Sequence, residues 1–411
     1  MNSYPPYNKN DNGGKCNMKW VSTFKYITIP YDEVAAFGEN LTQRVLFDHN
    51  VKGEKVRVRF SNRYGQEPMQ IEKATIGKYK DGKVVACKTL TCGGHERITL
   101  APDERILSDE VDYETEPGEK LVINLYFKER QNITGTCCFW SETGTVVEKY
   151  TGDVTNGGET DRVFFTTLQD YVGDTTGDNQ MHMFTGFDAV QVYTQDEVKV
   201  IAAFGDSITH MSYFTNPLLK RLLKEANGKA VLINSGIGGN RLLDDATVVD
   251  GKSLVFFGEA GLKRFEEDVF GLDDVDAVLV LIGINDIMHP IQLQGKAETV
   301  TAEDLIAGFR QITATAHDNG AEVYFGTITP SGNPEYPDWW IQKFEETRNG
   351  ANAYIRSGEG IEGYFDYDRE LRDEAKPDYI REGCHLGDGL HPNNQGGAMM
   401  ADLIDLRAIL G

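Results

Sequence analysis

The sequence has no hydrophobic run long enough to cross a membrane. Its longest apolar segment, residues 277–282, has the length of a β-strand, whereas a membrane-spanning helix needs about 20 apolar residues. Positive charge is also scarce, because 41 Lys and Arg residues are outnumbered by 64 Asp and Glu residues, and the formal net charge is -23. Nucleic acids and anionic membranes bind basic surfaces, so we expect neither as a partner.

Cysteine is also scarce, with six residues among 411. Cys137 and Cys138 are adjacent and no two Cys-X-X-Cys segments occur, so we expect no structural zinc, no other metal and no cofactor. Residues 1–15 are polar and lack the apolar core of a signal peptide. We therefore expect free thiols in a reducing cytoplasm; a secreted protein whose signal peptide has been removed is the alternative.

The length of the chain favours two domains, and its two halves have different hydrophobic patterns. In residues 1–195, short segments of alternating polarity, such as residues 55–60, are separated by turn sequences. This pattern favours an all-β accessory domain, an antiparallel sandwich of the jelly-roll type. Residues 170–180 are rich in Gly, Asp and Thr and predict a loop, whereas residues 189–193 predict another strand. Further strands are predicted at residues 25–30, 44–47, 69–79, 97–100 and 120–127.

From about residue 198 onward, apolar segments of strand length alternate with helical segments. The clearest helix covers residues 302–318, where apolar side chains recur every three or four positions, and Gly320 can end it. Alternating strands and helices indicate parallel βαβ units. We therefore predict a three-layer α/β domain over residues 196–411. Its strands are expected at residues 198–204, 230–237, 277–282, 322–328 and 363–367, with a second helix at residues 217–223.

Polar segments follow the strands of this second domain, at the sheet edge where α/β proteins bind their ligands. Ser207 follows the first strand, Gly239 the second and Asn285 the third, and Asp388 and His391 precede the last helix. These residues supply what acyl transfer requires. An imidazole oriented by a carboxylate activates a serine hydroxyl, and backbone N–H groups with a side-chain amide stabilise an oxyanion. The simpler interpretation of Ser207 and Asp388 is that they cap helices or turns.

The second half resembles the SGNH (GDSL) hydrolase family in the order and spacing of four segments: Gly-Asp-Ser ending at Ser207, Gly-Gly-Asn around Gly239, Gly-Ile-Asn-Asp around Asn285, and Asp-Gly-Leu-His from Asp388 to His391. The resemblance implies a flavodoxin-like fold, no metal, and esterase, lipase, thioesterase or carbohydrate deacetylase activity. It also implies a catalytic triad of Ser207, His391 and Asp388, with an oxyanion hole of Ser207, Gly239 and Asn285. Residues 56–65 resemble the β-rich N-terminal part of a two-domain subgroup.

Six further residues are predicted to contact the substrate: Asp206, His210, Arg241, His289, Trp339 and Trp340. His210 departs from the family pattern, in which we expect a small or acidic residue. The adjacent tryptophans suit stacking on a sugar face or a place in the pocket wall, and a place in the core is the alternative. Arg241 is suited to meet a polar substrate group or to pair with Asp244 or Asp245. Either histidine could instead be solvated.

The sequence thus predicts a serine esterase that removes short acyl groups from a small-molecule or oligosaccharide ester, with O-acetyl groups of a carbohydrate as the favoured substrate. One alternative is a non-catalytic carbohydrate-binding protein with a vestigial hydrolase domain. Another is a lipase or thioesterase for longer acyl chains. A metal site of His385, Asp388 and His391 is a further alternative, but their spacing matches no standard ligand pattern. A homo-oligomer is compatible with the sequence, which leaves the oligomeric state open.

Overall fold

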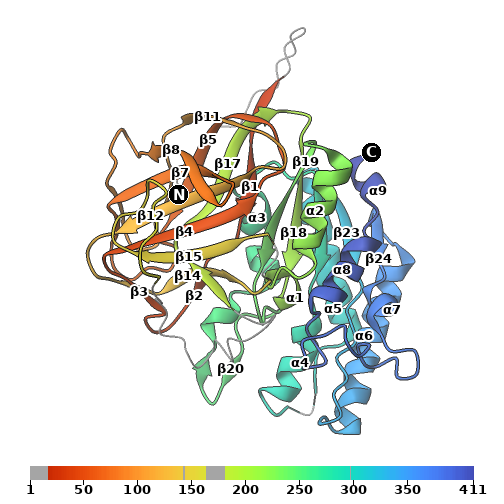
Figure 1. The fold of residues 1–411 in the computed structure, drawn as a ribbon. Helices are drawn as coiled ribbons and strands as arrows, with labels where there is room; N and C mark the ends of the chain where they lie inside the picture. Colours follow the sequence, from red (N-terminus) through yellow and green to blue (C-terminus); the bar gives the residue numbers. More distant parts are fainter. Residues whose placement is uncertain (1–16, 142–143, 163–180, 297) are drawn as a thin grey trace.

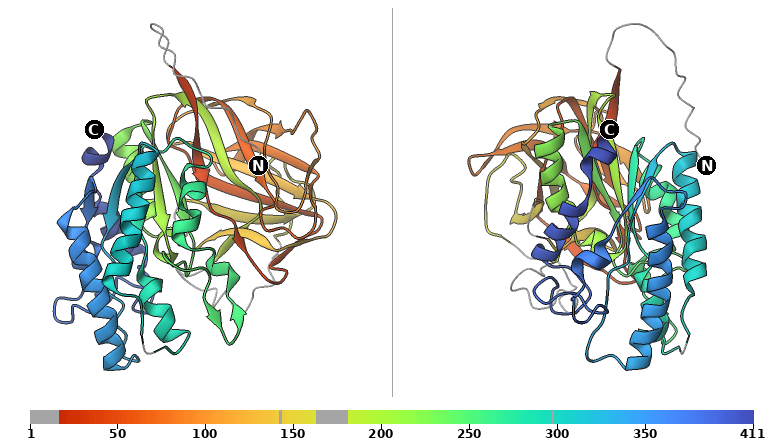
Figure 2. Two further views of the ribbon diagram at one scale, coloured as in Figure 1. Left: turned by 180° about the vertical axis from the view of Figure 1, so that it is seen from behind. Right: turned by 90° about the vertical axis from the view of Figure 1, so that its right-hand side faces the viewer.

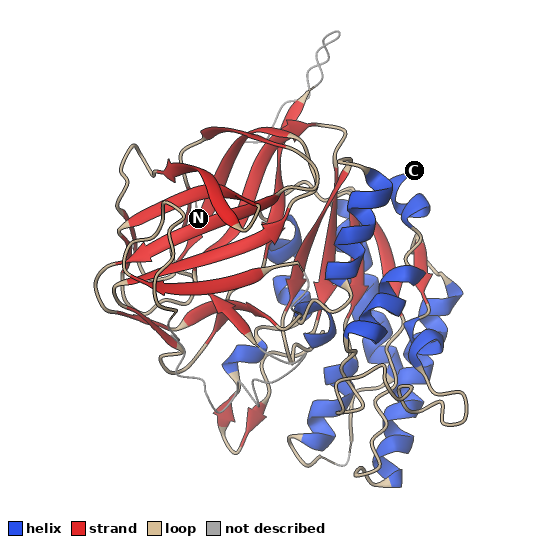
Figure 3. Ribbon diagram, viewed as in Figure 1, coloured by secondary structure: helices blue, strands red, loops and turns tan. Residues whose placement is uncertain are grey.

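The computed structural model describes residues 17–141, 144–162, 181–296 and 298–411. Strands fill the first half of the chain, and in the second half helices lie on both faces of a sheet (Figures 1 and 3). The two halves pack side by side (Figure 2). The predicted fold class, a β-rich part followed by an α/β domain with a parallel sheet, is confirmed. Among the helices in these ranges, none has the length and apolar character needed to cross a membrane.

Two antiparallel sheets of five strands form most of the first half. In the strand predicted at residues 55–60, Val56, Val58 and Phe60 are fully buried at alternate positions, as a strand facing a core requires. One sheet has the order β1 (Met18–Lys25), β17 (Gly186–Gln195), β5 (Gly53–Ser61) and β10 (Arg105–Leu107), with β11 (Val111–Thr115) also paired to β5. The other has the order β15 (Val146–Thr151), β4 (Leu41–Asp48), β12 (Lys120–Phe127), β7 (Lys73–Lys80) and β8 (Lys83–Leu90).

Short strands complete this half, and two of the predicted strands differ from the observed ones. The strand predicted at residues 25–30 is wrong, because β1 ends at Lys25 and the backbone leaves the sheet before the next strand begins. The segment at residues 69–79 is divided into two strands at Glu72. The loop predicted at residues 170–180 lies outside the described residues. The short strands are β2 (Ile29–Pro30), β3 (Ala36–Gly38), β6 (Met69–Ile71), β9 (Ile98–Leu100), β13 (Gln131–Ile133), β14 (Gly135–Phe139) and β16 (His182–Phe184).

Five parallel strands form the sheet of the second half, in the order β19, β18, β22, β23, β24. Numbered along the chain, this is the 2-1-3-4-5 order of flavodoxin-like folds. Side chains of β18 alternate between the two faces of the sheet. Ala203 packs in the cluster with α2 (Thr215–Ala226) and α8 (Asn394–Leu403), whereas Phe204 packs in the cluster with α3 (Gly261–Phe270) and α5 (Ala302–Asp318). The strands are β18 (Lys199–Gly205), β19 (Ala230–Gly236), β22 (Ala277–Leu281), β23 (Glu322–Gly326) and β24 (Gly363–Phe365), and a hairpin of β20 (Val248–Val249) and β21 (Lys252–Ser253) lies outside the sheet.

Side chains cap some of the helices of this half at their N-termini, as in α1 (Ser207–His210), α5, α7 (Tyr367–Leu371), α8 and α9 (Leu406–Leu410). The helix predicted at residues 302–318 is confirmed, and Thr301 caps it by accepting the N–H of Asp304 at 3.2 Å. Each predicted strand lies within two residues of its observed ends. The helices are α1 (Ser207–His210), α2 (Thr215–Ala226), η1 (Val255–Phe257), α3 (Gly261–Phe270), α4 (Ile284–Gln292), α5 (Ala302–Asp318), α6 (Asp338–Ser357), α7 (Tyr367–Leu371), α8 (Asn394–Leu403) and α9 (Leu406–Leu410).

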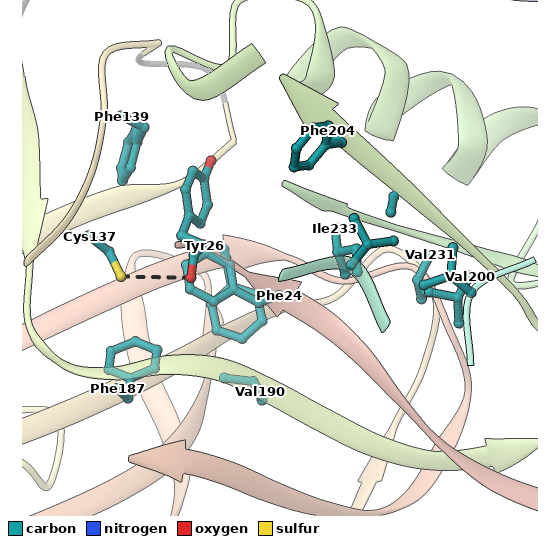
Figure 4. Close-up of a cluster of buried hydrophobic side chains, with 14 of the residues drawn as sticks. Phe24, Tyr26, Cys137, Phe139, Phe187, Val190, Val200, Phe204, Val231 and Ile233 are labelled. Atoms are coloured by element: carbon teal, nitrogen blue, oxygen red, sulfur yellow. Dashed lines mark hydrogen bonds between the residues drawn. The ribbon is translucent and has the colours of Figure 1, made fainter. Parts of the chain in front are cut away.

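The two halves share one hydrophobic cluster, which crosses their boundary. Phe24 and Phe187 from the first half belong to the same cluster as Phe204 from the second, and Figure 4 shows these side chains together. Polar contacts reinforce the boundary, since the N–H of Ser22 on β1 donates to the carboxylate of Asp273 at 2.6 Å. Both halves of the chain therefore support the carboxyl edge of the parallel sheet.

Candidate active site

Ser207 is the first residue of the short helix α1, and only Asp206 separates it from the end of β18. Asp206 caps this helix, because its buried carboxylate accepts the N–H of Ile208 at 3.1 Å. Gly205 is required for the close packing here, since a Cβ at this position would lie 2.2 Å from the carbonyl oxygen of Leu281 on β22. The tight turn from strand to helix thus places the Ser207 side chain at the carboxyl edge of the sheet.

Three side chains form a hydrogen-bonded chain at this edge. Nε2 of His391 lies 2.8 Å from Oγ of Ser207, and Nδ1 of His391 lies 2.6 Å from Oδ2 of Asp388. The other oxygen of Asp388 accepts the N–H groups of Leu390 and His391 at 2.9 and 3.0 Å. Because Nδ1 faces a carboxylate, it is the nitrogen that carries the proton, and Nε2 is free to accept one from the serine hydroxyl.

The surroundings of Asp388 keep its carboxyl ionised. Burial alone would raise its pKa, but the hydrogen bond and charge of His391 and the N–H groups of Leu390 and His391 outweigh burial and lower the pKa to about 2. The Asp388 side chain is 42% exposed and that of His391 is 22% exposed. The pair therefore borders solvent, and the Asp388 carboxylate keeps its negative charge across the physiological pH range.

Three N–H donors line the cavity that contains Ser207. Within the described residues, neither the N–H of Ser207 nor that of Gly239 has an acceptor. The Asn285 amide donates one hydrogen to the carbonyl oxygen of Asn240 at 3.0 Å and has a second hydrogen available. Ser207, Gly239, Asn285 and His391 all line the same cavity of about 510 Å³. Donors of this kind are what a developing oxyanion requires.

The loop after β19 is held by the elements around it. Gly239 has a φ of 71°, and a Cβ there would lie 2.0 Å from the ring of Phe257, so only glycine fits. The Asn240 amide donates to the carbonyl oxygens of Phe257 and Glu259, both at 2.7 Å, and its oxygen accepts from Arg264 at 2.9 Å. The absence of a side chain at Gly239 thus serves packing against Phe257 as well as access to the cavity.

Arg264 on α3 joins the ends of two strands beneath the site. Its guanidinium donates to the carbonyl oxygens of Gly205 and Ser235 at 2.8 and 2.9 Å, and it forms an ion pair with Asp268 at 2.9 Å. The guanidinium also lies over the ring of Phe204, 4.3 Å from its centroid. No local pattern in the sequence indicates this role of Arg264, because its contacts depend on where α3 docks against the sheet.

The cavity is lined by residues from both halves of the chain. Tyr31 of the first half stacks on Phe256 of the second, with ring centroids 6.4 Å apart and planes at 22°. Trp140 of the first half also lies in the cavity wall. None of these aromatic residues could be predicted, since nothing in the sequence of the first half indicates which of its loops meets the site. The remaining lining is mostly apolar and includes Ile29, Cys138, Met181, Met211, Phe257, Met288, Leu293, Leu386 and Leu390.

His210 and His289 both line the cavity, and both are buried rather than solvated. Nδ1 of His289 lies 2.7 Å from the hydroxyl of Thr247, and its ring stacks on Phe257 with centroids 5.0 Å apart. Burial, together with the charge of Arg241, lowers the pKa of His289 to about 3. His289 is therefore a neutral part of the cavity wall at physiological pH.

Asp206 and Arg241 were predicted to contact the substrate, but neither lines the cavity. Asp206 is buried behind the helix that it caps, and burial raises the pKa of its carboxyl to about 7. The Arg241 guanidinium donates to the carbonyl oxygen of Asp245 and lies 3.5 Å from the carboxylate of Asp244. Arg241 therefore makes the local pairing that was the alternative to a substrate contact.

Trp339 and Trp340, for which the sequence left a substrate contact and a place in the core open, do not line the cavity. Trp340 is buried on α6 and stacks on Phe344, with ring centroids 5.4 Å apart and planes at 5°. Trp339 is 50% exposed on the same helix. Adjacent residues of a helix point in different directions, so one of the two packs in the core while the other faces solvent.

The three residues considered as a metal site, His385, Asp388 and His391, make separate contacts. Nδ1 of His385 accepts the backbone N–H groups of Gly387 and Gly389 at 3.0 and 3.1 Å, whereas Asp388 and His391 bond to each other. Over the described ranges, no group of three or more His, Cys, Asp or Glu residues is arranged to hold a metal ion.

The family model of the GDSL-like Lipase/Acylhydrolase family matches residues 203–399. Similar solved structures include a catalytic mutant of an acetylxylan esterase from Geobacillus stearothermophilus, which is 19% identical with a TM-score of 0.40, over 51% of this chain and 94% of that one. A GDSL-like lipase from Bacteroides thetaiotaomicron is 20% identical with a TM-score of 0.37, over 51% of this chain and 87% of that one. No curated protein matches the chain.

The matched region contains Ser207, Gly239, Asn285, Asp388 and His391, the residues on which the predicted family rests. The prediction of the family from the sequence is confirmed. Residues 203–399 therefore form a domain of the GDSL-like lipase/acylhydrolase family.

Proposed function

We propose that this protein is a carboxylic ester hydrolase with Ser207 as its nucleophile. The observation that carries this proposal is the hydrogen-bonded chain from Ser207 through His391 to Asp388, with distances of 2.8 and 2.6 Å. A serine hydroxyl is a weak nucleophile until a neighbouring base takes its proton, and the base needs a carboxylate to orient it. Ser207 lines the cavity, so the carbonyl group of a bound ester can reach its hydroxyl.

In the first half-reaction, Oγ of Ser207 attacks the ester carbonyl carbon while its proton passes to Nε2 of His391. Asp388 stabilises the imidazolium that forms. The carbonyl oxygen becomes an oxyanion, which the N–H groups of Ser207, Gly239 and Asn285 stabilise. The tetrahedral intermediate then collapses, the bond to the alcohol oxygen breaks, and His391 returns the proton to that oxygen. The alcohol leaves, and the acyl group remains on Ser207.

In the second half-reaction, a water molecule takes the place of the alcohol. His391 removes one proton from the water as its oxygen attacks the acyl carbon, and the same donors hold the second oxyanion. Collapse breaks the bond to Oγ, and the proton on His391 passes to Ser207. The carboxylic acid leaves, and one water has been consumed for each ester cleaved.

We propose acetyl or other short acyl esters of a carbohydrate as the first candidate substrate. The ring of Phe257 packs against Gly239 next to the oxyanion donors, which favours a small acyl group there. Tyr31, Trp140 and Phe256 add aromatic rings to the lining, and aromatic faces stack well on sugar rings. Both halves of the chain supply these rings, which gives the β-rich half a part in holding the alcohol.

Esters with a longer acyl chain are the second candidate, and the apolar lining of the cavity favours them. Met211, Met288, Leu293 and Leu390 offer few polar partners to a sugar but suit a hydrocarbon chain. The cavity of about 510 Å³ is larger than an acetyl group needs. The two candidates share the same chemistry at Ser207 and differ in which part of the ester the cavity holds.

Hydrolysis of p-nitrophenyl esters from acetyl to octanoyl tests both the proposed esterase activity and the proposed acyl length, with Ser207→Ala as the control. We expect hydrolysis by the wild-type protein and none above background by the variant. Equal rates for the two proteins would overturn the proposal, and rates at background for both would favour a non-catalytic carbohydrate-binding protein. A kcat/KM that is highest for acetate, with acetate release from acetylated oligosaccharides, supports the first candidate. A maximum at a longer chain supports the second.

A further inference from the structure

His210 is the last residue of α1, and its fully buried ring has a neighbour at each nitrogen. Nδ1 accepts the backbone N–H of Gly238 at 2.9 Å. Nε2 lies 3.6 Å from the sulfur of Cys138 on β14, in the first half of the chain. The ring also meets Trp140 edge to face, with centroids 5.4 Å apart and planes at 80°. One imidazole thus joins the helix of Ser207, the loop after β19 and the β-rich half.

These contacts determine the protonation state of the ring. A backbone N–H can only donate, so Nδ1 must be unprotonated, and the hydrogen of the neutral ring lies on Nε2. Burial and the charge of Arg264 lower the pKa of His210 to about 3, although a hydrogen bond to the Cys138 backbone acts to raise it. The ring is neutral at physiological pH, and its nitrogens are engaged within the protein. His210 lines the cavity, but a direct hydrogen bond from its ring to the substrate does not fit this arrangement.

We infer that His210 is a positioning residue, which holds the loop of Gly238 and Gly239 in the orientation that oxyanion stabilisation needs; this inference rests on the proposed function. The N–H of Gly238 points to the histidine, whereas the next N–H along the chain, that of Gly239, has no acceptor among the described residues and lines the cavity. Two successive glycines have unusual backbone freedom. A buried acceptor restricts that freedom before the substrate binds, so the donor is already aimed when negative charge develops.

The packing around His210 explains why a large ring is accommodated where the family pattern has a small or acidic residue. A Cβ at Gly236 would lie 2.5 Å from the backbone nitrogen of His210, so the end of β19 packs directly on α1. On the other side, the N–H groups of Trp140 and Ser141 donate to the carbonyl oxygen of Met211 at 3.3 and 2.9 Å. The β-rich half therefore supports the helix end from behind, and the histidine ring fills the space between it and the loop.

Two substitutions distinguish the effect of the hydrogen-bond acceptor Nδ1 from the effect of the volume of the His210 ring. His210→Asn keeps an oxygen close to the position of Nδ1, whereas His210→Leu fills the space without an acceptor. His49 offers a matched control, because it is also fully buried, with Nδ1 2.7 Å from the hydroxyl of Thr23 and Nε2 against the carbonyl oxygen of Val51, and it does not line the cavity. His49→Asn and His49→Leu report what the loss of a buried histidine costs elsewhere in the protein.

We expect His210→Leu to lower kcat for p-nitrophenyl acetate about 10²-fold with little change in KM, since a misplaced donor affects the transition state rather than the bound ester. Inhibition by phenylboronic acid, whose serine adduct is tetrahedral, should weaken by a similar factor. His210→Asn should recover most of both losses. The two His49 variants should lower Tm but leave kcat of the folded protein unchanged.

A wild-type kcat in His210→Leu, or equal losses in His210→Leu and His210→Asn, would overturn the inference. If the leucine variant does not fold, ¹⁵N NMR of the wild-type full-length protein still decides, because the inference requires an unprotonated Nδ1 and a protonated Nε2 at neutral pH. A proton on Nδ1 would overturn it. Failure of the proposed function is a separate result, seen as hydrolysis by Ser207→Ala at the wild-type rate, and the NMR measurement does not depend on it.

Discussion

Asp388 lies three residues before His391 in the same turn, and its carboxylate holds the imidazole of His391 with 2.6 Å between Oδ2 and Nδ1. We expect Asp388→Asn to lower kcat about 10²–10⁴-fold with little change in KM, because a carboxamide neither fixes the tautomer of His391 nor stabilises its charged form. Steady-state kinetics with p-nitrophenyl acetate measure both parameters.

Asp373→Asn is the matched control for that change. Asp373 also accepts two backbone N–H groups in a turn, those of Ala375 and Lys376 at 2.8 and 2.9 Å, but it lies outside the cavity lining. We expect wild-type kcat from this variant. An equal loss in both variants would mean that the turn, rather than the contact with His391, determines the effect of Asp388→Asn.

Gly239→Ala should disrupt the loop that carries the proposed oxyanion donor. The new Cβ would meet the Phe257 ring at 2.0 Å, and a φ of 71° is unfavourable for alanine by about 1 kcal/mol. We expect kcat to fall by about 10²-fold or more. Gly358→Ala is the control for backbone strain alone, since its φ is 68° and nothing lies within 4 Å of its Cβ. Unaltered activity in Gly239→Ala would contradict the tight packing of Phe257 on this loop.

The second half of the fold could be predicted from the sequence because its signals are local. Buried parallel strands read as short apolar runs, and the polar residues that follow them must gather at one sheet edge. That rule brings Ser207, Gly239 and Asn285 to the same cavity, although dozens of residues separate them in the chain. Thr301 and Gly320 mark the ends of α5 in the same local way.

The walls of the cavity could not be predicted, because they depend on how the two halves dock. Tyr31 and Trp140 reach the site through contacts with distant residues, and no local pattern distinguishes them from other loop aromatics. For Trp340 the sequence left the pocket and the core open, and the structure places it on the buried face of α6. His210 could be recognised as a departure from the family pattern, but its bond to Gly238 required the structure.

The shared core leads to a prediction about the proposed domains, residues 1–195 and 196–411. Each half covers apolar surface of the other, and Trp140 and Ser141 donate across the boundary to Met211. We expect neither fragment alone to unfold cooperatively on heating, because separation exposes this surface to water. Co-expression of the two fragments should restore ester hydrolysis. A fragment of residues 196–411 that folds alone and matches the kcat of the full chain would contradict this prediction.

Burial of Asp206 predicts a stability that changes with pH. Its pKa is about 7 in the folded protein, where Asp286 also acts to raise it and His391 and Arg264 act to lower it, whereas an exposed Asp has its ordinary value of 3.8. Between these values the folded state holds a proton that the unfolded state has lost, so this group's contribution to the free energy of unfolding decreases from about pH 4 to pH 7 and is constant above. Asp206→Asn removes this dependence.

Relative to wild type, Asp206→Asn should therefore gain stability across that interval, by up to a few kcal/mol at pH 8, and show no further gain above it. Denaturant unfolding at pH 4, 6 and 8 measures the difference. Asp304→Asn provides a control of opposite sign, because the hydrogen bonds of Thr301 lower the pKa of Asp304. Its stabilising contribution is present above the unfolded pKa and is lost as pH falls, so that variant should be least stable relative to wild type at pH 8. A pH-independent difference for Asp206→Asn would mean that Asp206 is ionised in the folded protein throughout this range.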